Sequence, residues 1–340
     1  MNMIRKATLF AAACLAATTL TTNGFAADTT LRLGLVNQPT EPASQGSQRF
    51  ADLVAEKTDG RIEIQVFPAG QLGNNRELFT QLTTGAIELA IAPYGFISDA
   101  VPEYSSLLAG YFYDDWDDIV AVLEAEQFGQ AWNERLIDDA GLRVLDSFYY
   151  GTRQVTMNDK APTSPEEFAG IKLRSVPNPM SLSIARGLGA EPTPVPFPEL
   201  FQALRQGTVD GQENPLPTIH SNKFYEVQNQ LVLTGHQRLP LPWIINEEVY
   251  QSLSPEDQQA LEDAAAEAAV WTTELNQKLE GELTETLAEE GMTVVEISDE
   301  QRAVLAEAVQ AQIRESHDGS EWPAGFMDEL LAFVESTHSN

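Results

Sequence analysis

The longest helical pattern in the sequence lies near its carboxyl end. The segment Ser254–Asp257 supplies a capping serine, a proline in the first turn and acidic residues after it, which together start a helix. Apolar residues then recur at helical spacing as far as Gly291. A helix of this length measures about 54 Å at ~1.5 Å per residue, which exceeds the width of one ordinary domain. We therefore expect two lobes and one long helix that spans both.

Strand and helix patterns alternate in the amino-terminal part of the sequence. Residues 31–36 alternate as a strand does, residues 44–56 carry apolar side chains at helical spacing, and residues 62–66 alternate again. A second helical pattern, residues 76–84, leads into a third strand-like run at residues 87–93. This order is typical of βαβ units, so we expect an α/β fold whose sheet has parallel strands and right-handed crossovers.

Two places in the sequence suit a crossing between lobes. Residues 141–157 form one extended run that is long enough to leave one lobe and enter the other, and a second crossing is expected near Pro240. We expect lobe I to contain residues 27–151 and 240–279, and lobe II to contain residues 152–239 and 280–340. We expect a cleft between the two lobes.

The first 26 residues have the features of a secretory signal peptide. Arg5 and Lys6 precede an apolar stretch, and Gly24–Ala26 gives a small-x-small cleavage pattern. We expect a mature protein that begins at Ala27 and lies in the periplasm, since no other apolar run approaches the ~20 residues of a membrane span. Cys14 is the only cysteine, so the mature chain has no thiol. Lipidation of Cys14 is the alternative, although the usual leucine three residues upstream is missing.

The chain is strongly acidic, with 51 acidic and 20 basic side chains and a formal net charge of −31. Nucleic acids and anionic membrane surfaces are poor partners for such a protein. The simplest explanation is a solvated acidic coat. Against this background, two arginines at neighbouring strand ends would form a local positive focus for an anion.

Patterns of metal, cofactor and catalytic sites are missing from the sequence. The four histidines form no H-E-x-x-H pair, and neither a nucleophile elbow nor a phosphate loop is present. Asp114–Asp118 lacks the spacing and glycine of a calcium loop, and is better explained as acidic residues that open a helix. We expect a binding protein without metal or cofactor; the remote alternative is a periplasmic enzyme acting on a carboxylate.

Candidate ligand-binding residues concentrate between Ile171 and His236. Arg174 lies near the end of a strand-like run, and ligands of open α/β sheets bind at the carboxyl ends of strands. Its guanidinium offers a fork of N–H donors that matches a carboxylate. Asn214, in the polar turn expected over Asp210–Pro215, would brace that fork or bind the ligand. The alternative for Arg174 is an ion pair with a surface carboxylate, which would contribute little.

Two further cleft candidates come from the first lobe. Tyr94 lies in the loop that follows the third strand, and Asn75 precedes a helix near the same edge of the sheet. An ordinary surface aromatic or amide is an equally good interpretation of each. His236, at another strand end, is interpreted as a structural hydrogen-bonding residue.

Several segments in succession resemble the ligand receptors of tripartite ATP-independent periplasmic (TRAP) transporters, the DctP family. The segments are Leu31–Asn37, Asp59–Gly73, Gly151–Asn158, Ile171–His236 and Pro242–Asn246, so the likeness covers nearly the whole mature chain. Such receptors capture organic acids for a permease with a small and a large membrane subunit. The resemblance implies a two-lobed periplasmic binding protein fold with the ligand cleft between the lobes and a long helix that spans both, as expected here from the helical pattern.

The resemblance also implies roles for individual residues. Arg174 occupies the place of the arginine that forms the principal salt bridge with the ligand carboxylate. Arg153 matches a second ligand-binding arginine, and Asn214 matches an asparagine that orients the carboxylate site. Phe197 matches an aromatic residue that packs on the ligand; a core residue at the start of a helix over Phe197–Leu204 is the alternative.

The resemblance gives a preference among ligands. Sialic-acid receptors carry acidic residues where this chain has Asn74 and Asn75, which makes sialate less favoured. The segments ENPLPTI and KFYEVQ are more similar to relatives that take sugar acids than to C4-dicarboxylate receptors. We expect a uronate or aldonate; a C4-dicarboxylate or another monocarboxylate is the alternative. Lobe II would contribute Arg153, Arg174, Phe197 and Asn214 to the closing cleft, and lobe I would contribute Asn75 and Tyr94.

Overall fold

One mixed sheet runs through the part of the chain that the structure, a computed structural model, describes, which is residues 27–338. The expected signal peptide and Cys14 lie outside these residues. The strand order is β2-β1-β3-β8-β4-β7-β5-β6, and β9 pairs with β8. The strands are β1 (Thr29–Gly34), β2 (Ile62–Phe67), β3 (Leu89–Ile91), β4 (Leu142–Met157), β5 (Lys172–Ser175), β6 (Glu191–Pro194), β7 (Gly211–Pro215), β8 (Gln230–Asn246) and β9 (Thr293–Glu296).

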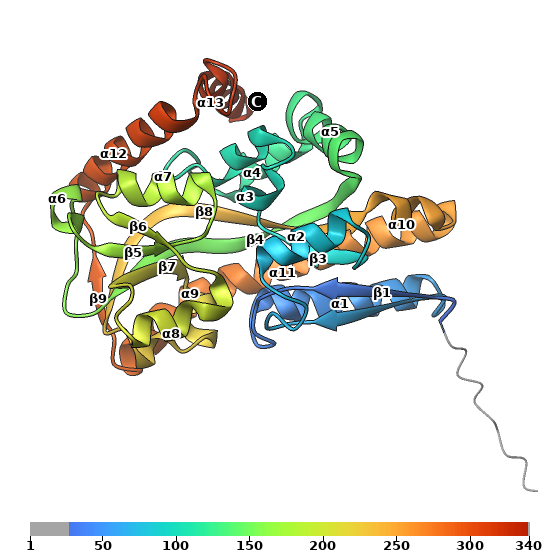
Figure 1. Cartoon of the computed structure of the whole chain (residues 1–340), viewed down its shortest axis with the longest axis horizontal. Coiled ribbons are helices and arrows are strands. Elements are labelled where there is room, and N and C mark those ends of the chain that lie inside the picture. Colours follow the sequence, from blue (N-terminus) through green and yellow to red (C-terminus); the bar gives the residue numbers. More distant parts are fainter. Residues whose placement is uncertain (1–26, 339–340) are drawn as a thin grey trace, which may run out of the picture.

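Two long antiparallel strands, β4 and β8, join the two ends of this sheet. They pair from Leu142 opposite Asn246 to Met157 opposite Gln230, with three shifts in register. Figure 1 shows them crossing the middle of the molecule between β1 and β2 at one end and β5, β6 and β7 at the other. Gly151 lies at one register shift with φ +129°, and a Cβ there would be 2.7 Å from Pro215. A side chain at this position would therefore be strained.

Only part of the sheet is parallel. The expected parallel arrangement is confirmed for β1 with β2 and with β3, but β3 with β8, β8 with β4 and β4 with β7 are antiparallel. The expected polar turn over Asp210–Pro215 is wrong, because Gly211–Pro215 forms strand β7. The segment lacks the apolar alternation by which strands are recognised. Its polar side chains Gln212, Glu213 and Asn214 are nevertheless buried, in hydrogen-bonded contacts.

Helices cover both faces of the sheet (Figure 1). The α-helices are α1 (Pro42–Lys57), α2 (Asn75–Thr83), α3 (Tyr94–Ile97), α4 (Trp116–Glu124), α5 (Ala131–Ala140), α6 (Pro165–Phe168), α7 (Pro179–Gly187), α8 (Leu200–Arg205), α9 (Leu216–Ser221), α10 (Glu247–Ser252), α11 (Pro255–Glu289), α12 (Asp299–His317) and α13 (Phe326–Thr337). Short 3-10 or π turns are η1 (Pro102–Leu108), η2 (Glu126–Gln130), η3 (Phe197–Glu199) and η4 (Phe224–Glu226).

The expected long helix is α11, which has 35 residues. The Ser254 side chain caps it by accepting a hydrogen bond from the Asp257 backbone N–H. It packs against α1, β4 and α9, and therefore contacts elements from both ends of the sheet. Close approach to α1 depends on Gly46, where a Cβ would lie 2.0 Å from Thr272 Oγ1. Among the described helices, none is long and apolar enough to cross a membrane.

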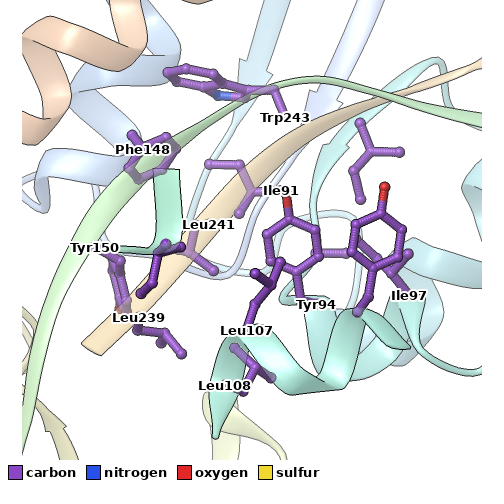
Figure 2. Packing of buried hydrophobic residues seen from close by; sticks show 14 of the residues in the cluster. Ile91, Tyr94, Ile97, Leu107, Leu108, Phe148, Tyr150, Leu239, Leu241 and Trp243 are labelled. Atoms are coloured by element: carbon purple, nitrogen blue, oxygen red, sulfur yellow. The ribbon is translucent and has the colours of Figure 1, made fainter. Parts of the chain in front are cut away.

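Two clusters of buried apolar residues form the core. In the larger cluster, Trp243 packs on Phe50 and Phe148, with ring centroids 5.4 Å and 4.7 Å apart. Figure 2 shows Trp243 and Phe148 in the same cluster as Ile91, Leu239 and Leu241. The smaller cluster lies around α8, α9 and the last turns of α11. Strands β4 and β8 contribute side chains to the larger cluster along most of their length. This packing holds the polar side chains of the same two strands in fixed positions.

Candidate ligand-binding site

A cavity of about 50 Å³ opens where strands from both ends of the sheet meet. It is lined by apolar residues from β8 and by polar residues from several elements: Asn37, Asn75, Tyr150, Arg153, Arg174, Asn178, Ser181, Asn214 and Gln237. An adjoining cavity of about 290 Å³ shares four of its lining residues, namely Asn75, Arg174, Val176 and Phe197. Together the two cavities form a cleft with Arg174 and Asn75 on its walls.

Arg174 is a buried cation without a matching anion. It lies on β5 with 1% of its surface exposed, and its Nε donates to the backbone oxygen of Val195 at 2.9 Å. Its Nη1 has no hydrogen-bond partner in the described residues. Burial lowers the pKa of Arg174 to about 10. Because a buried charge without a partner is costly, an anion that entered the cavity could stabilise this guanidinium.

Arg153 has a partner within the chain. Its guanidinium contacts the Glu213 carboxylate through Nε and Nη2, the latter at 2.9 Å from Oε1. His236 Nε2 lies 3.3 Å from the same carboxylate, and its Nδ1 lies 2.8 Å from Thr234 Oγ1. Burial opposes the charged form of Glu213, but Arg153 and His236 outweigh it and lower the Glu213 pKa to about 2. Arg153 thus lines the cavity as half of a neutralised pair.

Three other predicted residues lie around the same cleft. Asn214 is buried on β7, and its Nδ2 donates to Gln212 Oε1. Phe197 places its ring centroid 5.9 Å from Arg174 Cζ and lines both cavities. Asn75 begins α2, and its buried Oδ1 has no partner in the described residues. Among the fully buried polar atoms of the described cleft residues, Arg174 Nη1 is a donor and Asn75 Oδ1 an acceptor without a hydrogen-bond partner.

Tyr94 lies elsewhere. It is fully buried in α3, where its hydroxyl is 2.6 Å from Ser147 Oγ and its ring stacks on Tyr104 with centroids 4.9 Å apart. Figure 2 shows it among core residues such as Ile97 and Leu107. The helical turn that begins after Pro93 directs the tyrosine into the core, so it does not line the cleft, while Pro93 does. The expectation that Tyr94 faces the ligand is corrected accordingly.

The sequence analysis missed a polar network behind the cleft. Glu41 is fully buried, and its carboxylate accepts hydrogen bonds from Asn37 Nδ2 at 2.8 Å and Tyr150 hydroxyl at 3.1 Å. Thr218 and Asn222 donate to it at 3.0 Å and 2.9 Å. Asn37 follows a strand end, so the rule that selected Arg174 would have selected it too. Tyr150 lies inside a long strand and gives no such signal.

No group of three or more histidine, cysteine, aspartate or glutamate side chains that could hold a metal ion occurs in residues 27–338. The cleft instead combines one unneutralised guanidinium, several amides and hydroxyls, and an aromatic ring. Such a set can bind an anion with polar substituents through charge-assisted and neutral hydrogen bonds.

Comparisons with known proteins agree with this chemistry. A family model described as bacterial extracellular solute-binding protein, family 7, matches residues 33–319. The sialic acid-binding periplasmic protein SiaP of Vibrio cholerae is 35% identical over 269 residues, which cover 79% of this chain and 83% of that protein.

Two solved structures are similar over nearly the whole chain. The sugar acid binding protein DctPAm from Advenella mimigardefordensis, in complex with galactonate, has a TM-score of 0.85 and 29% identity, and covers 90% of this chain and 98% of that chain. A TRAP periplasmic solute binding protein from Sulfurospirillum deleyianum, with bound succinate, has a TM-score of 0.81 and 26% identity, with coverages of 91% and 99%. The predicted α/β, two-lobed fold is thereby confirmed. The chain belongs to family 7 of the bacterial extracellular solute-binding proteins, the receptors of TRAP transporters.

Proposed function

We propose that this receptor captures a monocarboxylated sugar acid, a uronate or an aldonate, in the periplasm and delivers it to the small and large membrane subunits of a TRAP permease. The observation that carries the proposal is the buried Arg174, whose Nη1 has no partner and which lines the cleft. The protein acts as a receptor and releases its ligand unchanged.

The ligand carboxylate binds the guanidinium of Arg174. Two parallel N–H···O bonds suit this pair because both groups are planar. Asn214 lies on the same cavity wall and adds an amide donor or acceptor, while the Phe197 ring covers an apolar face of the ligand. Arg153 is held by Glu213, so its contribution is to orient the site and to donate any N–H that the pair leaves free.

The rest of the cleft favours hydroxyls over a second carboxylate. Besides Arg174, the cations that line the two cavities are Arg153, paired with Glu213, and Arg76, paired with Asp99. A second carboxylate would therefore meet no unneutralised cation. The amides and hydroxyls of the cleft suit a polyol chain, and Asn75 Oδ1 would accept a hydrogen bond from one of its hydroxyls. DctPAm, which binds galactonate, supports this choice; the succinate-bound relative supports the C4-dicarboxylate alternative.

Binding closes the cleft in this proposal. With the lobe boundaries expected from the sequence, Arg174, Phe197 and Asn214 belong to lobe II, and Asn75 and Asn37 belong to lobe I. A ligand that contacts both sets binds the closed form more tightly than the open form, which shifts the population toward closure. The permease would then distinguish loaded from empty receptor by shape.

Titration calorimetry of the mature protein tests the proposal. Galactonate, gluconate and galacturonate would be compared with succinate and malate, and nuclear magnetic resonance of the recovered ligand would report any chemical change. We expect saturable binding of at least one sugar acid, tighter than that of either dicarboxylate, and unchanged ligand. Tighter binding of succinate or malate would contradict the ligand class, and turnover would contradict the receptor.

A further inference from the structure

A second cavity, of about 480 Å³, lies on the opposite face of strands β4 and β8 from the cleft. Successive side chains of a strand point to opposite faces, and the lining follows this rule. Arg153 lines the cleft while Thr152 and Gln154 line the second cavity, and Gln237 lines the cleft while Arg238 lines the second cavity. The walls are completed by residues of the 111–114 segment, α11 and α12. This cavity plays no part in the proposed function.

Two arginines of this cavity are held only by backbone oxygens. Arg238 Nη1 donates to the oxygen of Tyr113 at 3.0 Å. Arg302 Nη1 donates to the oxygen of Thr234 at 2.6 Å, and its Nη2 is 3.4 Å from the oxygen of Leu233. Neither forms a salt bridge with a described carboxylate, and each retains N–H groups that donate no hydrogen bond within residues 27–338. Both are partly buried, so water covers only part of each guanidinium.

A shielded guanidinium without a salt bridge is rare among the described residues. Every other lysine and arginine within residues 27–338 either forms a salt bridge or is exposed, with one exception, Arg174 in the cleft. The exposed cations without a salt bridge are Lys160, Lys172, Arg186, Arg205 and Lys278. In a chain with 51 acidic and 20 basic side chains, a shielded guanidinium that stays unpaired is unexpected. Arg238 and Arg302 therefore share the feature that distinguishes Arg174.

The acidic groups that line the cavity, Glu280 and Asp114, form no salt bridge with these arginines. Glu280 uses its carboxylate to accept hydrogen bonds from the Tyr149 hydroxyl, at 2.7 Å, and from the Thr152 backbone N–H. Burial raises the pKa of Glu280, while its hydrogen bonds from the Thr152 N–H and the Tyr149 hydroxyl and the charge of Arg238 oppose that rise. Asp114 lines the cavity and is exposed to solvent. Gln154 accepts from Gly235 N at 2.8 Å through its oxygen, which leaves its amide N–H groups as further donors.

We propose that this cavity is a binding site for a small oxyanion of the phosphate or sulfate type, held by Arg238 and Arg302 with Gln154 as a neutral donor. Guanidinium groups match such anions because their planar forks give paired hydrogen bonds with charge. Two of them around one cavity suit a doubly charged anion better than a single carboxylate.

The test uses calorimetric titration with inorganic phosphate and sulfate at constant ionic strength, with chloride as the reference salt. The protein carries Arg174→Ala, which removes the cleft cation so that any heat comes from elsewhere. We expect saturable binding of one anion per chain, weakened at least about tenfold by Arg238→Gln or by Arg302→Gln, since each change removes a charged donor. Arg186→Gln, at an exposed unpaired arginine, is the matched control and should leave the affinity unchanged.

Crystals soaked in selenate give a second measurement that needs no variant, in case Arg302→Gln disturbs the fold. An anomalous peak within hydrogen-bond distance of both Arg238 and Arg302 supports the site. The proposal is overturned if phosphate and sulfate give no saturable heat, if both variants bind like the Arg186→Gln control, or if the selenate peak is missing from the cavity. These results would leave sugar-acid binding in the cleft untouched.

Discussion

Two buried arginines on neighbouring parts of the sheet have opposite surroundings. Arg153 is surrounded by groups that neutralise and orient it, namely Glu213 and, through that carboxylate, His236. Arg174 has one backbone hydrogen bond and an unpartnered Nη1. A buried cation that is already paired holds neighbouring groups in position. A buried cation that is left unpaired can attract an anion that enters the cavity. The predictions below separate these two contributions, from the largest expected effect to the smallest.

Removing the partner of Arg153 should have the largest effect. Glu213→Gln leaves the Arg153 charge buried without an anion, so we expect the free energy of unfolding to fall by about 3–5 kcal/mol. Urea unfolding followed by circular dichroism measures this. Asp328→Asn, which breaks the exposed pair of Arg314 and Asp328, is the control and should change stability by less than about 1 kcal/mol. Equal effects would mean that the Glu213 pair is no more important than a surface pair.

The low pKa of Glu213 predicts a loss of stability in acid. A carboxyl group whose pKa is lower in the folded state stabilises the protein above its unfolded pKa, and this stabilisation is lost as the pH falls toward the folded value, here about 2. Between about pH 5 and pH 3 the group should contribute a loss of roughly 2 kcal/mol, at ~1.4 kcal/mol per pH unit below the ordinary glutamate pKa. The Glu213→Gln protein should show a shallower fall over this range; identical slopes would refute the assignment.

Arg174→Lys should weaken sugar-acid binding without weakening the fold. Lysine keeps the charge but cannot form two parallel hydrogen bonds, so we expect a loss of about 1.5–3 kcal/mol in binding free energy. Titration calorimetry gives the affinity, and urea unfolding should show stability equal to that of the natural protein. Arg205→Lys, at an exposed arginine, serves as the control. Near-natural affinity in the Arg174→Lys protein would remove Arg174 from the site.

The smallest effect is expected at Phe197. Its ring lies beside Arg174 and lines both cavities of the cleft, so Phe197→Leu removes an aromatic face but keeps an apolar one. We expect a loss of about 0.5–1 kcal/mol in ligand binding, measured by titration calorimetry. An unchanged affinity would assign Phe197 to the core near Phe224, where their ring centroids are 6.4 Å apart.

The sequence predicts the parts of this structure that local periodicity determines. The long helix α11 follows from its cap and apolar spacing, and β4 follows from one extended run. The sequence makes Arg174 a candidate because ligands of open α/β sheets bind at strand ends, and the structure places it on the cleft wall. The resemblance to TRAP receptors added Arg153, Asn214 and Phe197, which also line the cleft.

What the sequence does not predict depends on contacts between distant residues. Strand β7 has the polar sequence of a turn, but its side chains are buried against partners on other strands, such as Thr156 and Arg153 of β4. The sequence predicts a loop at Tyr94 and does not reveal the single turn of helix that directs its side chain into the core. Glu41 was missed because Thr218, one of its donors, is 177 positions away.

A crystal structure of the mature protein with a bound aldonate tests the central claim most directly. The account predicts a carboxylate oxygen of the ligand within hydrogen-bond distance of Arg174 Nη1, with the hydroxyl chain extending toward Asn75. A carboxylate bound elsewhere in the cleft, with Arg174 contacting only hydroxyls or water, would contradict it.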